Sequence, residues 1–206
     1  MKTIFFDSET TGLDAFKDKI TLMSILDGNK TRLIERFDAA KIAELKELLE
    51  NNLVVGHNLK FDLKFLKQQF NIEPTNLFDT YIAEILISGG LKARQKGAAT
   101  LEAVTKNRLK LELNKDEKLR CSFKGVEPIT KEQEKYARED VEVLAPIYKQ
   151  QQSEITKLGI QRTFNIEMSA LPAVVWLELS GLPLDMESLK KKEVEVKEKI
   201  IEAKTK

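Results

Sequence analysis

Two carboxylates near the start of the chain, Asp7 and Glu9, have a spacing that suggests chemistry. They follow the apolar run Ile4-Phe5-Phe6, which predicts a buried strand over residues 2–6. Side chains two residues apart on a strand point to the same side, so both carboxylates would face one small volume. Such a pair is costly without a cation between the acids, and oxygen ligands suit magnesium or manganese. An acidic turn at a strand end explains the same residues, so the pair alone does not establish a metal site.

A further carboxylate follows the apolar run Leu53-Val54-Val55, which predicts a short buried strand that stops at Gly56. Asn58 suits the cap position of the helix expected to begin here. Asp62 lies four residues later, so Asn58 and Asp62 share one helix face, next to Phe61. The spacing therefore places a carboxylate one turn into a helix that leaves a buried strand.

Tyr136 and Asp140 are also four residues apart, on a long helix expected from Thr130 to about Leu158. The capping pair of Thr130 with Gln133 predicts the start of this helix. Taken alone, a tyrosine and an aspartate on one helix face indicate little about chemistry.

Two other polar residues are better explained by structure than by chemistry. His57 is the only histidine, and a lone histidine is more often structural than a ligand. Asp79, in Phe78-Asp79-Thr80, precedes an apolar helix, so we expect it to cap that helix and to have no role at a metal.

The remaining pattern indicates the class of fold. Strands are expected over 20–26 and 31–36, joined by a turn at 27–29, which gives the sheet an antiparallel or mixed start. Alternating strands and helices then predict an α/β fold with later strands parallel. Further helices are expected over 39–49, over 98–104, over 164–180 and from 186 onward.

Composition limits the class of protein further. The 206 residues carry a net charge of +1, and their apolar content of 42% is enough for a substantial core. A single cysteine, Cys121, excludes a disulfide framework within the chain and fits a reducing compartment. No apolar stretch reaches the roughly 18 residues that span a bilayer, and no signal segment begins the chain. We therefore expect a soluble, cytoplasmic protein without a membrane partner.

Residues 91–125 differ from the rest of the chain in charge. They hold ten Lys or Arg against four Asp or Glu, a local net charge of +6. A solvated basic surface is the simplest explanation. A basic stretch near an acidic metal site would also suit a substrate with a phosphate backbone.

Taken together, the segments 7–13, 56–62 and 136–140 resemble the three exonuclease motifs of the DEDD superfamily, in the same order and at roughly the same separations. The chain is similar to the DEDDy branch, and specifically to the 3′–5′ proofreading exonuclease domain of the DNA polymerase I family. The DEDDh branch would have a histidine five residues before Asp140, where this chain has Lys135. The resemblance covers about residues 1–152.

The resemblance implies a ribonuclease H-like fold, a mixed sheet flanked by helices, with a helical C-terminal extension. It implies an exonuclease domain over residues 1–158 and, over 159–206, an extension similar to the junction that leads to a polymerase domain. The segment 167–185 carries this second similarity.

The activity implied is metal-dependent hydrolysis of phosphodiester bonds from the 3′ end of DNA, with release of nucleoside monophosphates. Two Mg²⁺ or Mn²⁺ ions about 3.5–4 Å apart would take part. By resemblance, Asp7 would bridge the ions, Glu9 and Asp140 would complete one site, and Asp62 would help to hold the second. Tyr136 would orient the attacking water.

The family's substrate is a single-stranded or frayed 3′ end of DNA, and its partner is a DNA polymerase. Two alternatives remain: an exoribonuclease like RNase D, and a non-catalytic nucleic-acid-binding module on the same fold. The four acids and the tyrosine argue against the second, and the junction-like tail favours DNA. The resemblance assigns the contacts with the terminal nucleotides to Thr10, Leu13, Asn58 and Phe61.

Overall fold

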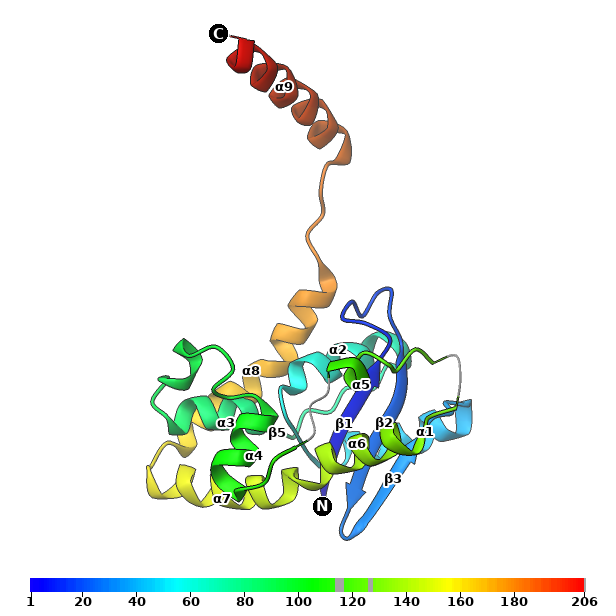
Figure 1. Cartoon of the computed structure of the whole chain (residues 1–206), viewed down its shortest axis with the longest axis vertical. Helices are drawn as coiled ribbons and strands as arrows, with labels where there is room; N and C mark the ends of the chain where they lie inside the picture. Colours follow the sequence, from blue (N-terminus) through cyan, green and yellow to red (C-terminus); the bar gives the residue numbers. More distant parts are fainter. Residues whose placement is uncertain (114–116, 126–127, 206) are drawn as a thin grey trace.

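A mixed five-stranded sheet forms the centre of the molecule, in a computed structural model that describes residues 1–113, 117–125 and 128–205 (Figure 1). The strand order is β3-β2-β1-β4-β5. Strands β2 and β3 continue antiparallel from β1, whereas β4 and β5 run parallel to it, as the sequence pattern predicted. The strands are β1 (Thr3–Thr10), β2 (Ile20–Asp27), β3 (Lys30–Ile34), β4 (Leu53–Gly56) and β5 (Leu77–Asp79).

Strand β1 is longer than the sequence predicted, because its pairing with β2 continues past the apolar run. Asp7 lies opposite Ser24 and Glu9 opposite Leu22 in the antiparallel register. The expectation that the strand ends before the two acids was therefore wrong, and both carboxylates project from the strand itself. Regular backbone fixes their direction more firmly than a turn would.

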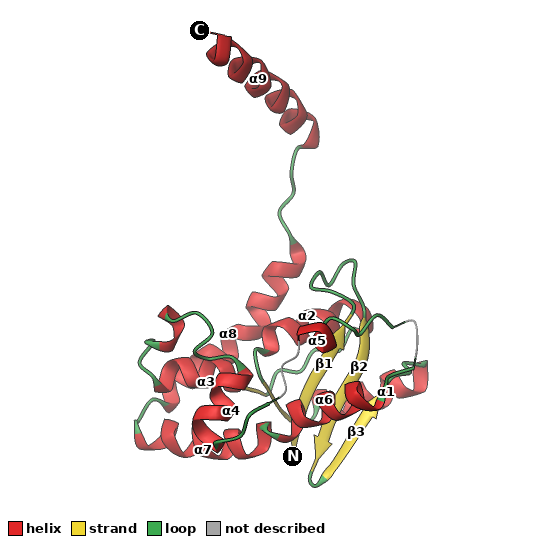
Figure 2. Cartoon of the chain, in the orientation of Figure 1, coloured by secondary structure: helices red, strands yellow, loops and turns green. Residues whose placement is uncertain are grey.

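Helices cover both faces of the sheet. Helix α6 crosses one face over β1, β2 and β3 (Figure 2). On the same face, Phe5 of β1 packs against Tyr148 of α7. Side chains alternate along a strand, so Ser8 points to the other face, where it donates a hydrogen bond to Asp62 of α2. The helices are α1 (Ala39–Glu50), α2 (Leu59–Phe70), α3 (Thr80–Ile87), α4 (Leu101–Leu109), α5 (Glu117–Arg120), α6 (Lys131–Glu142), α7 (Leu144–Lys157), α8 (Gln161–Ser180) and α9 (Met186–Thr205), with a 3₁₀ turn η1 (Lys92–Arg94).

The long helix expected from Thr130 to about Leu158 is two helices, α6 and α7, which meet at Val143. Pro146 is in the first turn of α7, where its missing N–H is tolerated. In an uninterrupted helix it would remove the bond to the carbonyl of Glu142. The capping box of Thr130 with Gln133 is confirmed at the start of α6.

The helix expected over residues 98–104 begins later, because Thr100 caps it. The Thr100 hydroxyl accepts a hydrogen bond from the backbone N–H of Ala103, and α4 then extends to Leu109. Capping by a threonine side chain is a local signal that the spacing of apolar residues does not include.

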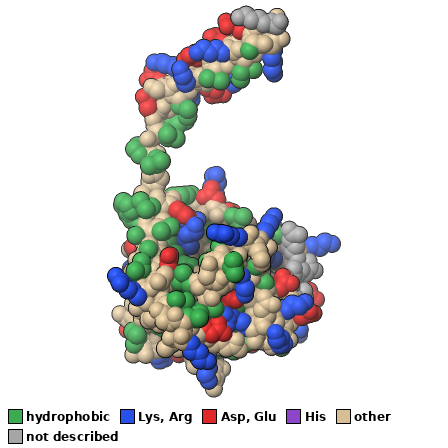
Figure 3. Space-filling view, turned by 90° about the vertical axis from the view of Figure 1, so that its left-hand side faces the viewer, with side chains coloured by type: hydrophobic (Ala, Val, Ile, Leu, Met, Phe, Trp, Pro, Cys, Tyr) green, Lys and Arg blue, Asp and Glu red, His purple; other side chains and the backbone are tan. Residues whose placement is uncertain are grey.

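The C-terminal region divides into a packed part and an exposed part. Four side chains of α8 belong to the same hydrophobic core as the sheet: Phe164, Met168, Leu171 and Val175. Helix α9 lies apart from the sheet and has no buried residue, and apolar side chains line the segment that leads to it (Figure 3). The division of the chain into domains at residue 158 stays a prediction. In the described part of the chain, no helix is both long and apolar enough to cross a membrane.

Candidate active site

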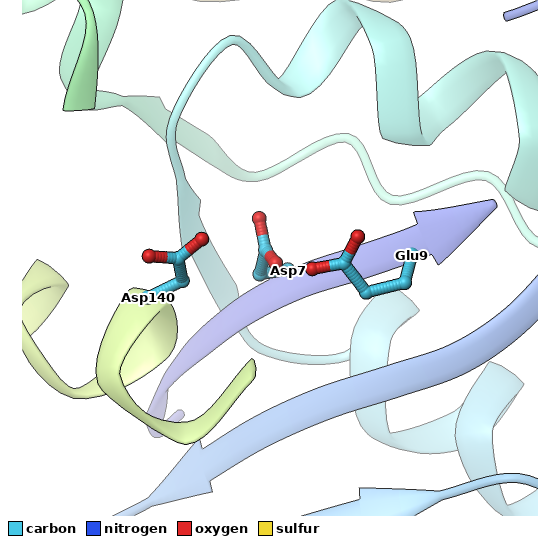
Figure 4. Close-up of side chains that lie close together, drawn as sticks. All are labelled: Asp7, Glu9 and Asp140. Atoms are coloured by element: carbon cyan, nitrogen blue, oxygen red, sulfur yellow. The ribbon is translucent and has the colours of Figure 1, made fainter. Parts of the chain in front are cut away.

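Three carboxylates converge between the central strand and the helix that crosses it. Asp7 and Glu9 project from β1 and Asp140 from α6, with one oxygen atom of each within 4.8 Å of the others (Figure 4). The two-residue spacing on β1 places the first two on one face, and the packing of α6 on that face supplies the third. Glu9 and Asp140 are only 9% and 5% exposed.

This carboxylate cluster (Asp7, Glu9 and Asp140) fits a hard divalent cation. Like charges at this separation repel one another, and burial removes much of the water that would screen them. The donor atoms are all carboxylate oxygens, which suit Mg²⁺ or Mn²⁺ and offer no thiolate or imidazole that would favour zinc. The residues present therefore match the cation that the sequence predicted.

Asp62 lies outside this cluster, on α2, and its partner Ser8 points away from the face of β1 that carries Asp7 and Glu9. It is 4% exposed, and its carboxylate accepts a hydrogen bond of 2.5 Å from the hydroxyl of Ser8. Burial raises the pKa of Asp62 to about 7, against the opposing effect of this hydrogen bond. The expected role of Asp62 at a second ion stays a prediction.

Asp79 holds the start of α2 as well as the start of α3, a contact that the sequence pattern did not indicate. Its carboxylate accepts hydrogen bonds from the backbone N–H groups of Asn58 at 2.9 Å, Leu59 at 2.8 Å and Tyr81 at 2.8 Å. Burial raises the pKa of Asp79 to about 6, although these N–H donors act in the opposite direction. Its predicted role as a helix cap is confirmed.

The expectation that the Asn58 side chain caps α2 was wrong. Asn58 has a left-handed backbone with φ of 60°, and its side chain makes no capping hydrogen bond. Side-chain capping requires an extended backbone, and here Asp79 supplies the acceptor instead. The Asn58 side chain is exposed on the loop between β4 and α2.

Tyr136 lies beside the carboxylate cluster, one helical turn before Asp140. Its side chain is 5% exposed, and its ring centroid is 6.1 Å from that of Phe123. Burial raises the pKa of Tyr136 far above its usual value, and the negative charges of Asp140 and Glu9 raise it further. The phenol is therefore protonated at neutral pH.

Of the predicted substrate residues, Thr10 ends β1 and Leu13 lies on the loop that follows, whereas Asn58 and Phe61 lie at the start of α2. The Thr10 hydroxyl donates to the carbonyl of Gly12 at 2.6 Å, and Leu13 is 75% exposed on the following loop. Asp18 holds that loop by accepting a hydrogen bond from the Asp14 N–H at 2.9 Å. Phe61 of α2 is partly buried against Phe65, with 4.9 Å between ring centroids.

His57 lies between β4 and α2 and contacts the start of α3. Its Nδ1 atom is 2.8 Å from the hydroxyl of Thr80, and its ring meets that of Tyr81 edge-on at 5.8 Å. These contacts agree with the structural role expected for it.

The sheet order, with an acid-bearing strand at its centre and an acid-bearing helix across it, is the ribonuclease H-like fold of 3′–5′ exonucleases. The chain belongs to the 3′–5′ exonuclease family, whose model DNA_pol_A_exo1 matches residues 1–156. The fold class predicted from the sequence is thereby confirmed.

Similar proteins include DNA polymerases and an exoribonuclease. DNA polymerase I of Aquifex aeolicus (strain VF5) is 30% identical over 207 residues, which cover 92% of this chain and 33% of that protein. The chain spans about a third of the length of the curated relatives it matches. Brucella melitensis NrnC has a TM-score of 0.76 at 22% identity, covering 88% of this chain and 86% of that one. Escherichia coli RNase D has a TM-score of 0.72 at 20% identity, covering 85% and 45%.

Proposed function

We propose that the chain is a metal-dependent 3′–5′ exonuclease that hydrolyses phosphodiester bonds from the 3′ end of DNA and releases nucleoside monophosphates. The observation that carries the proposal is the carboxylate cluster of Asp7, Glu9 and Asp140, within 4.8 Å, on a chain of the 3′–5′ exonuclease family. A non-catalytic binding module would have no use for three acids that repel one another inside the protein.

In this proposal Asp7, Glu9 and Asp140 hold one divalent ion, and Asp62 contributes to a second. When bound, the ions would activate water at neutral pH and stabilise the charge that develops on the leaving oxygen. The hydroxyl of Tyr136 stays protonated and donates a hydrogen bond that orients the attacking water. Its raised pKa makes the phenol unsuitable as a base. A structure of NrnC with bound Mg²⁺ supports this choice of ion for a protein of the same fold.

The terminal nucleotides are held in this proposal by residues around the carboxylate cluster. Leu13, exposed at the tip of a held loop, wedges between bases, and Phe61 packs against a terminal base. Thr10 and Asn58 supply polar contacts. The similarity to DNA polymerase I favours DNA as substrate, proofreading as the role and a polymerase as the partner.

An exoribonuclease function is the second candidate, because RNase D, an exoribonuclease, shares the fold. One solved structure of Brucella melitensis NrnC is that of the protein bound to pGG. At identities of 20–22%, the similarity to NrnC and RNase D shows the fold alone, and the digestion experiment below distinguishes DNA from RNA as the substrate.

The test is digestion of 5′-labelled single strands, one of DNA and one of RNA, with magnesium present. We expect a ladder of products that shorten from the 3′ end, with DNA cut faster than RNA and no products in the presence of a chelator. Faster cleavage of RNA would favour the exoribonuclease, and hydrolysis that continues in the chelator would refute the metal-dependent mechanism.

We also expect single strands and mismatched 3′ ends to be cut faster than blunt duplex. Loop 11–19, which presents Leu13, can separate bases only where the strand is unpaired or easily frayed. Because contacts with the backbone release counterions, the rate at limiting substrate should fall as salt rises. Initial rates on the three substrates over a series of salt concentrations test this, and blunt duplex cut faster than single strand would contradict it.

A further inference from the structure

The basic stretch 91–125 is not one surface, because several of its cations are used inside the fold. Lys92 and Arg108 both bind the buried carboxylate of Glu84. Arg108 also donates two hydrogen bonds to Glu154, at 3.0 and 2.9 Å. Residues 114–116 of the stretch lie outside the described residues. The charge of the stretch therefore does not identify a substrate surface, whereas a polar group on β2 lies beside the carboxylate cluster itself.

Ser24 is in the middle of β2, next to the strand that carries two of the three acids. It is the partner of Asp7 in the antiparallel pairing of β1 with β2. Side chains of paired residues point to the same face of a sheet, with their Cβ atoms about 4.5–5.5 Å apart. On that face Leu22, two residues before Ser24, belongs to the same hydrophobic cluster as Tyr136 of α6. The register therefore places the Ser24 side chain beside Asp7, on the face that α6 covers.

The Ser24 hydroxyl is buried and, among the residues that the structure describes, has no hydrogen-bond partner. Ser24 is only 1% exposed. Its neighbours along this face of β2 are Leu22 and Leu26, both buried, so the hydroxyl interrupts an apolar row. A hydroxyl that leaves water without gaining a partner destabilises a protein. Such a group needs an explanation, and the acidic site beside it offers one.

Of the two strand neighbours of Ser24, only Asp7 has a polar side chain. The partner of Ser24 on β3 is Leu33, whose side chain cannot accept a hydrogen bond. A carboxylate has two oxygens with several acceptor positions, so Asp7 can bind a cation and accept a hydrogen bond together. The Ser24 oxygen moves between staggered positions by rotation about one torsion, which leaves the pairing of the strands unchanged.

We propose that the Ser24 hydroxyl donates a hydrogen bond to the Asp7 carboxylate when a divalent cation occupies the carboxylate cluster, and so fixes the direction of this ligand. The inference rests on the proposed metal-dependent function. Carboxylates that bind metals are themselves held by hydrogen bonds, which orient them toward the ion. Ser24 is therefore a positioning residue, which acts on the cation through Asp7.

The test removes the Ser24 hydroxyl in the full chain and measures the binding of Mg²⁺ in the absence of substrate. Ser24→Ala is compared with a matched control, Thr105→Val, which also deletes a buried hydroxyl that has no partner in the described part of the chain. Thr105 is 0% exposed on α4, a helix that packs on α7 and carries none of the three acids. The melting temperature of each protein over a series of magnesium concentrations gives its apparent Kd for Mg²⁺.

For Ser24→Ala we expect the apparent Kd for Mg²⁺ to rise about 10- to 100-fold, the usual effect of removing a hydrogen bond to a metal ligand. Cleavage of a labelled single-stranded DNA should fall at limiting magnesium and recover as magnesium is raised. Without metal, the melting temperature should stay the same or rise, because an unpaired buried hydroxyl has been removed. Thr105→Val should bind Mg²⁺ as the unsubstituted protein does.

Two results would overturn the inference. One is a Ser24→Ala variant with the same apparent Kd for Mg²⁺ as Thr105→Val. The other is a fall in the metal-free melting temperature of Ser24→Ala with that Kd unchanged, because Ser24 would then have a structural role alone. An unsubstituted protein whose melting temperature does not respond to magnesium, and which cleaves no nucleic acid, would refute the proposed function and the inference with it.

Discussion

The variant Asp7→Ala is expected to lose nuclease activity by much more than about 100-fold while keeping its fold. Removing a residue that only hydrogen-bonds to a metal ligand already lowers metal affinity or activity about 10- to 100-fold. Asp7 is proposed as a direct ligand, so its removal should cost more. In the absence of metal, its removal takes one negative charge out of a group of three carboxylates within 4.8 Å. The melting temperature of the metal-free protein should therefore stay the same or rise.

The measurements are the cleavage rate with magnesium and the melting temperature with and without it. Asp27→Ala is the matched control, because Asp27 lies at the other end of the β1–β2 pairing, opposite Ile4, and binds Lys2 at 2.9 Å. The control should keep full activity. Magnesium should raise the melting temperature of the control more than that of Asp7→Ala. A large drop in the metal-free melting temperature of Asp7→Ala would show that Asp7 is structural.

The sequence predicted the part of the site that depends on local periodicity. Alternation along a strand places Asp7 and Glu9 on one side, whatever the rest of the fold does. The local pattern could not predict where β1 ends. Acidic residues are unfavourable in a strand, and only the pairing with Ser24 and Leu22 of β2 keeps the backbone extended at Asp7 and Glu9.

Contacts between distant segments were harder to predict. Asp79 caps its own helix, as local pattern indicated, but it also accepts from the N–H of Leu59, twenty residues earlier. No spacing rule relates β5 to the start of α2. Likewise, the net charge of the basic stretch gave no sign that Arg108 pairs with Glu84 inside the fold, because that pairing depends on how α4 packs on α3 and α7.

The variant Tyr136→Phe separates the chemical step from binding. It keeps the ring that packs on Phe123 and leaves Asp140 and the other acids in place, so DNA affinity and the melting temperature should hardly change. The turnover number should fall about 10²- to 10⁴-fold, because a group that orients a nucleophile contributes that much to the rate. Tyr148→Phe is the matched control, since its hydroxyl contacts Gln152 on the surface of α7.

The pH dependence of the unsubstituted protein distinguishes the two possible roles of the Tyr136 hydroxyl. A phenol acting as general base must be ionised, so its pKa, which burial and the neighbouring carboxylates raise, would make the rate increase tenfold per pH unit throughout the neutral range. A phenol that orients water acts in its protonated form, so Tyr136→Phe should lower the rate by the same factor at pH 7 and pH 9. A deficit that widens tenfold with each unit of pH would assign proton transfer to Tyr136. A turnover number within a factor of about two of the unsubstituted protein would leave the hydroxyl without a catalytic role.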